Sequence, residues 1–233
     1  MPQNEIQTPA MVVDRWPFRD SDWVVLLLTP RIGMITALAR GARGSRHRFP
    51  GSLEFLVLSR LRLRPPRGAG MYQVLEADIV QGFPGFWDDL ARLETGQGLL
   101  MLGRDLLREA PVTEEIFDRM REAVARMEVA PPESVHGVLW QAALDLFACL
   151  GHPPHQDRCP RCGRDAADWA EAAIGPDGVL RCGECAGGMA RRFPARALDP
   201  RSGQWPGDRR ETERLLSLWV SGVLGRPWSL PGR

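Results

Sequence analysis

Four cysteines form two Cys-x-x-Cys pairs, and their spacing predicts a metal site. Nineteen residues (163 to 181) separate Cys159-Pro-Arg-Cys162-Gly from Cys182-Gly-Glu-Cys185. Each short turn brings two sulfurs to one ion, and the intervening segment lets the second pair complete a tetrahedron, as in four-thiolate zinc sites. Because four Cys ligands leave no open position for water or substrate, Zn²⁺ is predicted to be structural. Disulfides or unligated thiols are the alternative, but nothing else in the chain indicates secretion.

The arginines form a second set of residues whose chemistry could support a function. Residues 31–67 contain nine Arg and one acidic residue, Glu54, although the whole chain has a net charge of only +1. Such a basic segment suggests a polyanionic partner, because guanidinium groups bind phosphate bidentately and stack on bases. All 30 basic residues are Arg, which a GC-rich genome explains more simply than selection at each site. The candidate DNA-binding residues are Arg31, Arg40, Arg43, Arg46, Arg48, Arg60, Arg62 and Arg64.

Five runs rich in Val, Leu and Ile are predicted to be the strands that position these arginines. Turns containing Pro and Gly separate the runs, which span residues 11–15, 23–29, 33–40, 52–64 and 71–81. Five strands in so short a segment are typical of a small closed barrel such as the oligonucleotide-binding (OB) fold. A fragment of a β-sandwich is the alternative.

Most of the arginines fall on one predicted strand and one predicted loop. The alternation in residues 52–64 places Arg60, Arg62 and Arg64 on one face, about 7 Å apart, where they could follow successive phosphates or form a solvated outer face. Residues 40–48 hold four Arg and His47 among small residues, which predicts a mobile basic loop. Three aromatic residues could stack on bases, although core packing is the more common role: Trp16, Phe18 and Phe49.

After residue 84 the apolar spacing becomes helical. The first predicted helix, 86–108, has an apolar side formed by Leu90, Leu93, Leu100 and Leu107. The second begins after an N-cap at Thr113, and the third runs from 131–134 to a stop at Gly151. A last helix is expected over about 208–224, after a connecting loop at 194–207. The predicted fold class is therefore α+β, with an OB-like domain at 1–82 and a helical domain at 83–233 that includes a zinc unit at 155–192.

Composition and termini favour a cytoplasmic protein. Of its 233 residues, 44% are hydrophobic and 25% charged, which is ordinary for a globular chain. The N-terminus lacks the basic start and apolar run of a signal peptide, and the apolar run 23–28 is too short to span a membrane. Cys149, on a predicted helix, is expected to be a buried small apolar residue.

Several catalytic patterns are absent from the sequence. It has no phosphate-binding loop with lysine, no Gly-x-Ser-x-Gly and no His-Glu-x-x-His. His152 and His155 precede the first cysteine pair, but four cysteines already complete a zinc site. We therefore predict that the protein is not an enzyme.

The order of these features resembles the bacterial DNA repair protein RecO family. Segments similar to that family are Phe18-Arg19-Asp20-Ser21-Asp22, Arg40-Gly41-Ala42-Arg43, Gly51-Ser52-Leu53-Glu54-Phe55, and Leu150-Gly151-His152-Pro153-Pro154 before the first cysteine pair. Asp20 stands where the family usually has Glu, and His152 replaces an aromatic residue. The resemblance implies a mediator of recombinational repair that binds single- and double-stranded DNA and anneals strands. It also implies binding to RecR and to single-stranded DNA-binding protein, and help in loading RecA.

Two other functions remain open at this point. The helical body and the zinc unit could form a protein-interaction scaffold with only incidental affinity for DNA. A zinc enzyme such as a nuclease is the third possibility, against which the closed four-cysteine set argues.

Overall fold

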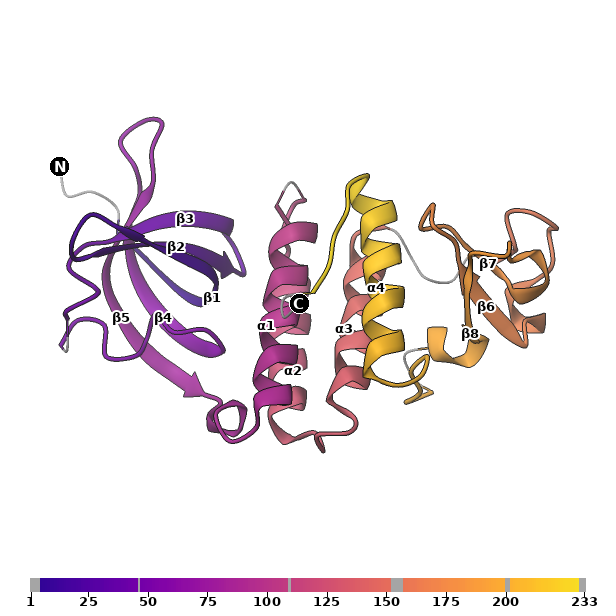
Figure 1. The fold of residues 1–233 in the computed structure, drawn as a ribbon. Helices are drawn as coiled ribbons and strands as arrows, with labels where there is room; N and C mark the ends of the chain where they lie inside the picture. The colour runs from indigo at the N-terminus through magenta and orange to yellow at the C-terminus, as the bar shows by residue number, and fades with distance from the viewer. Residues whose placement is uncertain (1–4, 46, 109, 152–156, 200–201, 231–233) are drawn as a thin grey trace. The chain divides into compact units, whose positions relative to one another are not determined.

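The structure, a computed structural model, describes residues 5–45, 47–108, 110–151, 157–199 and 202–230. The chain forms two compact units, Met1–Val129 and Ala130–Arg233. The first contains a β-barrel and two helices, and the second contains two helices and the four-cysteine segment (Figure 1). Among the described residues, no helix is both long enough and apolar enough to cross a membrane.

A closed five-stranded barrel forms most of the first unit, which confirms the predicted OB-like fold. Its strands are β1 (Ile6–Phe18), β2 (Asp22–Thr29), β3 (Gly33–Ala39), β4 (Val57–Arg64) and β5 (Tyr72–Gly82). They pair in the order β1-β2-β3-β5-β4, and β4 pairs with β1 to close the barrel. All pairs are antiparallel except β3 with β5, which is parallel. Apolar side chains from all five strands fill the interior.

The fourth strand is shorter than predicted. The strand begins only at Val57, its burial alternates only from Ser59 onward, and residues 52–56 lie before it in a turn. The Glu54 N–H donates to the Gly51 carbonyl (3.2 Å), and Leu56 has a φ of 57°, which an extended strand excludes. Leu53 and Leu56 are both buried, although strict alternation along a strand would place them on opposite faces.

Two helices complete the first unit. They are α1 (Leu90–Leu106) and α2 (Glu114–Val129), and the short 3₁₀ helix η1 (Pro84–Phe86) precedes them. Thr113 caps α2 as predicted, because its hydroxyl accepts from the Ile116 N–H (3.3 Å). The predicted apolar side of the first helix is wrong at Leu90, whose exposure is 70%. Since α1 contacts both β1 and α2, its buried surface does not follow a single apolar stripe.

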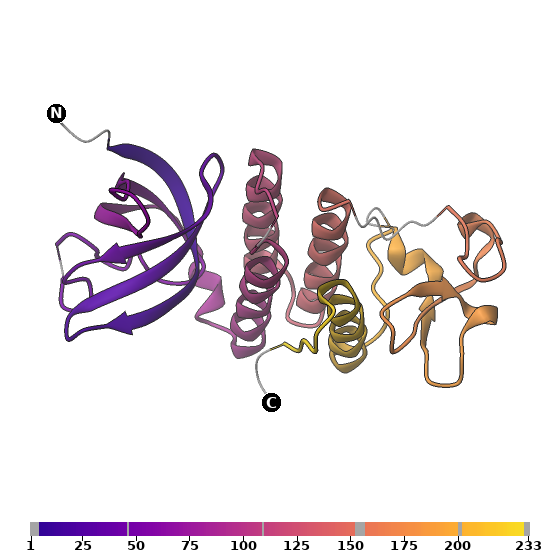
Figure 2. The same ribbon diagram turned by 90° about the horizontal axis from the view of Figure 1, so that it is seen from above.

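The second unit is built on α3 (Val135–Cys149) and α4 (Arg209–Leu224), which lie side by side (Figure 2). Phe147 stacks on Trp219, with 4.4 Å between ring centroids. The Trp140 indole donates to the Ala197 carbonyl (2.7 Å) in the 3₁₀ helix η4 (Ala195–Leu198). The segment predicted as a plain connecting loop therefore contains a short helix that closes the core. Cys149, predicted to be buried, is only half-buried.

Candidate metal centre and nucleic-acid interface

The four cysteines predicted to bind metal lie together. Their sulfur atoms are all within 4.8 Å of one another, and Cys162 Sγ lies 3.7 Å from Cys182 Sγ. A tetrahedral zinc ion with Zn–S bonds of about 2.3 Å would space its sulfurs about 3.8 Å apart. No disulfide joins these cysteines, all of which are free. The donor set is thus compatible with a structural metal. His152 and His155, considered as spare ligands, lie outside the described residues.

A small sheet holds the second cysteine pair in place, whereas the first pair lies in a turn closed by a bridge between Arg158 and Asp165. Its strands are β6 (Glu171–Ile174), β7 (Leu180–Cys182) and β8 (Arg191–Pro194), antiparallel in the order β7-β6-β8. The second cysteine pair begins where β7 ends and continues through the 3₁₀ helix η3 (Gly183–Cys185). Two 3₁₀ helices flank the sheet, η2 (Ala166–Asp168) before it and η4 after it. The sequence analysis missed this sheet, because strands of three or four residues are too short to show a period.

Glycine follows a cysteine in each pair, for two different physical reasons. Gly163 has a φ of 74°, and its N–H donates to the Cys159 carbonyl (2.9 Å), which closes a tight turn. Gly183, in contrast, does not have a positive φ. A Cβ there would lie 2.8 Å from Glu171 Cβ, so the second glycine permits close approach between the turn and β6.

The thiol groups do not ionise equally. The pKa of Cys159 is lowered to about 6: burial opposes this shift, but hydrogen bonds from the backbone of Cys182, Cys162 and Arg161 outweigh it. Contact with the Cys162 side chain and burial raise the pKa of Cys185 to about 12, and burial raises the pKa of Cys182. Four thiolates would repel one another at this distance, so full ionisation of the cluster requires a bound cation.

Arginine side chains link the two cysteine pairs. Arg164 forms a two-bond ion pair with Glu184, in which Nη2 lies 2.6 Å from Oε2. The same contact lowers the pKa of the Glu184 carboxyl. Arg161 donates to the Cys185 carbonyl (3.1 Å). These contacts therefore connect the two cysteine pairs without a bound metal ion.

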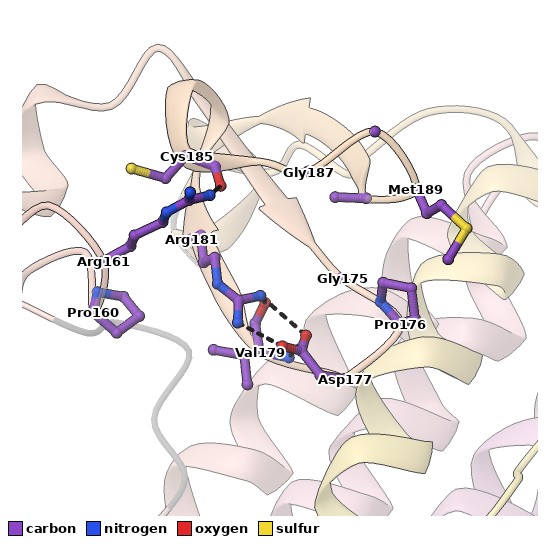
Figure 3. Close-up of a pocket in the computed structure, with 12 residues that line it drawn as sticks. Pro160, Arg161, Gly175, Pro176, Asp177, Val179, Arg181, Cys185, Gly187 and Met189 are labelled. Atoms are coloured by element: carbon purple, nitrogen blue, oxygen red, sulfur yellow. Dashed lines mark hydrogen bonds and ion pairs between the residues drawn. The ribbon is translucent and has the colours of Figure 1, made fainter.

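An open groove of about 600 Å³ lies beside the cluster (Figure 3). Asp177 and Arg181 form a two-bond ion pair on its wall (2.5 and 3.0 Å), and this pair lowers the pKa of Asp177 to about 2. Met189 is exposed at its edge. The remaining lining residues are mainly Pro, Gly, Val and Ala, together with Arg161 and Cys185. Nothing in the sequence pattern indicated this groove.

On the barrel, three arginines of the segment 40–48 project from its surface. Arg40, Arg43 and Arg48 are exposed, and within the described ranges of the chain none of them forms an ion pair. We call these three residues the loop arginines. Arg46, predicted with them, lies outside the described residues.

Hydrogen bonds fix the loop to the turn between β1 and β2. Asp22 accepts from the Gly41 N–H (2.7 Å), and Arg43 donates from its backbone to the Ser21 carbonyl (3.0 Å). The Arg43 guanidinium donates to the Asp20 carbonyl (3.2 Å), and Arg48 donates to the Arg40 carbonyl (2.9 Å). Because these acceptors are neutral carbonyls, both side chains retain their positive charge for a ligand.

The row of arginines on β4 has the predicted orientation but is largely neutralised. Arg60 is exposed and lies opposite Asp78 on β5. Arg62 forms ion pairs with Glu5 (2.8 Å) and Glu76 (2.5 Å), and Arg64 lies 3.4 Å from Glu5. These carboxylates come from neighbouring strands or from the residue before β1.

The remaining residues singled out for DNA contacts occupy different settings. Arg31 forms an ion pair with Glu114 at the start of α2 (2.7 Å). Phe49 is only 5% exposed and belongs to the barrel core, so it is not a stacking platform. Trp16 and Phe18 are exposed at the end of β1. Arg19, which the sequence analysis did not select, lies over the Phe18 ring at 5.3 Å.

A closed OB-like barrel, a helical segment and a four-cysteine cluster in this order define a small barrel protein whose C-terminal unit has a donor set compatible with a structural metal. Residues 1–83 match the family model described as "Recombination protein O N terminal". The chain is 30% identical over 194 residues to the DNA repair protein RecO of Anaeromyxobacter dehalogenans (strain 2CP-C), covering 83% of this chain and 76% of that protein. It is 31% identical over 228 residues to RecO of Myxococcus xanthus (strain DK1622), covering 93% and 91%. The chain belongs to the RecO family.

Proposed function

We propose that this protein is a non-enzymatic mediator of recombinational DNA repair that binds DNA and anneals complementary strands. Two observations support this role: the relatives carry the name DNA repair protein, and the loop arginines project without carboxylate partners from an OB-like barrel. The second observation carries the proposal, because unpaired guanidinium groups on a barrel suit a phosphate backbone. Its site of action would be DNA in the cytoplasm.

Annealing by this surface needs no covalent chemistry. Two single strands repel each other through their phosphates, and bound guanidinium groups reduce that repulsion. Contacts to phosphate carry no sequence information, so strands of any sequence would bind and the bases would remain available for pairing. The loop arginines would therefore hold a strand, while Watson–Crick pairing selects its complement.

The proposed cofactor is a structural Zn²⁺ held by Cys159, Cys162, Cys182 and Cys185. When bound, it would neutralise the clustered thiolates and stabilise the second unit, with no role in a reaction step. Metal analysis of the purified protein should give one zinc per chain, and removal by a chelator should lower the melting temperature. An unchanged melting curve after confirmed metal loss would contradict the structural role.

The experiment that tests the proposed function measures single-strand binding at several salt concentrations, followed by annealing. Three or four phosphate contacts predict a slope of log affinity against log salt of roughly −2 to −3. Complementary dye-labelled strands should anneal faster with the protein and be recovered at full length. A flat salt response, annealing at the spontaneous rate, or cleaved strands would contradict the proposal.

Family membership suggests protein partners, and a separate observation favours a second candidate function. RecR, single-stranded DNA-binding protein and RecA loading are proposed on that ground alone, and purified-component binding assays would test each one. The groove beside the cysteine cluster favours the second candidate, a protein-interaction scaffold with incidental DNA affinity. Normal DNA binding after Arg43→Ala and Arg48→Ala substitution would favour the scaffold over the DNA-binding role.

A further inference from the structure

A pocket on the barrel, separate from the groove beside the cysteine cluster, lies between the end of β3 and the connection from β4 to β5. It has a volume of about 460 Å³, which is within the usual range for small-ligand sites. Leu38, Pro65, Pro66 and Met71 contribute apolar surface to it. Met71 is 42% exposed, so it is available for contact with a ligand. We call this hollow the β3–β5 pocket.

Its charged lining is entirely positive. Arg40, Arg64 and Arg67 line the pocket, and no acidic residue does. Arg67 is exposed and, like Arg40, makes no ion pair within the part of the chain that the structure describes. Arg64 forms an ion pair with Glu5 (3.4 Å), although its buried Nε has no hydrogen-bond partner. The pocket therefore combines an apolar surface with two arginines, Arg40 and Arg67, for which the described part of the chain supplies no carboxylate.

The parallel pairing of β3 with β5 places an aromatic residue beside this surface. Tyr72, the single tyrosine in the chain, lines the pocket and pairs with Ala37 in the parallel contact between β3 and β5. Part of its side chain packs against the barrel core, which fixes its position. A fixed ring beside Met71 and two prolines is suited to a planar ligand.

We propose that the β3–β5 pocket receives one unstacked base of single-stranded DNA, with its phosphates on Arg40 and Arg67. This inference rests on the proposed DNA-binding function. Arg40 belongs to both the pocket and the loop arginines, so one strand can continue from the pocket onto the loop. A duplex keeps its bases paired and stacked inside, so only a single strand can offer a base to the pocket.

The test compares three ligands of equal length: an oligothymidylate, an abasic single strand and a duplex. Fluorescence anisotropy would measure binding by the full-length protein and by Met71→Ser. Met71 supplies exposed apolar surface for the base beside the Tyr72 ring, so this variant should bind oligothymidylate roughly three- to tenfold more weakly. Its affinity for the abasic strand and the duplex should stay within about twofold of wild type, because phosphate contacts remain.

Two controls separate the pocket from general effects. Met71→Leu keeps the apolar surface and should preserve the preference for thymidylate over the abasic strand. Val80→Ser removes a similarly exposed apolar side chain (49%) nine residues farther along the chain, near the opposite end of β5. It should leave all three affinities unchanged.

The possible outcomes separate failure of the pocket from failure of the proposed DNA-binding function. Equal losses for all three ligands in Met71→Ser, or no loss for any of them, would overturn the pocket while leaving DNA binding intact. Absence of measurable binding by the wild-type protein to every ligand would overturn both the pocket and the proposed function. Selective loss for oligothymidylate alone would support both.

Discussion

Arg43 and Arg62 are both exposed to some extent on the barrel, yet they should contribute very differently to DNA binding. The Arg43 guanidinium donates to a neutral carbonyl, whereas Arg62 lies between the carboxylates of Glu5 and Glu76. A phosphate approaching Arg62 must displace those carboxylates or share the side chain with them. Replacing each arginine separately by alanine therefore distinguishes a projecting charge from a neutralised one.

The size of the effect follows from counterion release. One lost phosphate contact on a single strand makes the slope of log affinity against log salt shallower by about 0.7. At about 0.1 M salt this corresponds to roughly fivefold weaker binding, or about 1 kcal/mol. Arg43→Ala should show this loss. Arg62→Ala should change affinity less than about twofold, since its charge is already offset by two carboxylates.

Fluorescence anisotropy with a labelled single strand, measured from about 50 to about 300 mM salt, provides both slopes. Equal melting temperatures of the two variants would show that the barrel is intact. The reasoning is refuted if Arg62→Ala lowers the slope as much as Arg43→Ala does, or if Arg43→Ala leaves the slope unchanged.

Three further results are expected. Glu5→Gln removes a carboxylate that offsets two arginines of β4, so anisotropy should show tighter single-strand binding and a slope steeper by up to about 0.7; unchanged binding would mean that β4 stays clear of DNA. Because Cys182 and Cys185 have raised pKa values, both are protonated near pH 7, and metal binding must release at least these two protons. Apparent metal affinity should thus rise as pH rises, and calorimetry in buffers of different ionisation enthalpy would count the protons, with a count near zero opposing the assignment. Gly183→Ala places a methyl group 2.8 Å from a neighbouring side-chain carbon and should cost about 1–3 kcal/mol in metal-loaded unfolding, whereas Gly187→Ala, with open space around it, should not.

Sequence patterns predicted the elements that depend on local order. The spacing of two Cys-x-x-Cys turns was sufficient to bring four sulfurs together, because each turn is short and the metal geometry leaves few arrangements. Alternation also placed Arg60, Arg62 and Arg64 correctly on one face of β4. Strand boundaries were less accurate, since Leu56 is apolar and buried although its backbone leaves the extended region.

The features that the sequence did not reveal depend on register between distant segments. Glu5 and Glu76 are far from Arg62 in the chain and meet it only through the β1–β4 and β4–β5 pairings. The β3–β5 pocket likewise requires the parallel pairing of β3 with β5 at Tyr72, which no local sequence period predicts. Both findings shift the proposed interface from the row on β4 toward the loop arginines and Arg67.

Hydrogen–deuterium exchange on the full-length protein, with and without a single-stranded oligonucleotide, tests the central claim most directly. Binding through the loop arginines and the β3–β5 pocket predicts slower exchange in peptides that cover residues 38–49 and 64–73. The four-cysteine unit should exchange at the same rate in both samples. Protection confined to residues 157–199, with none on the barrel, would contradict the account.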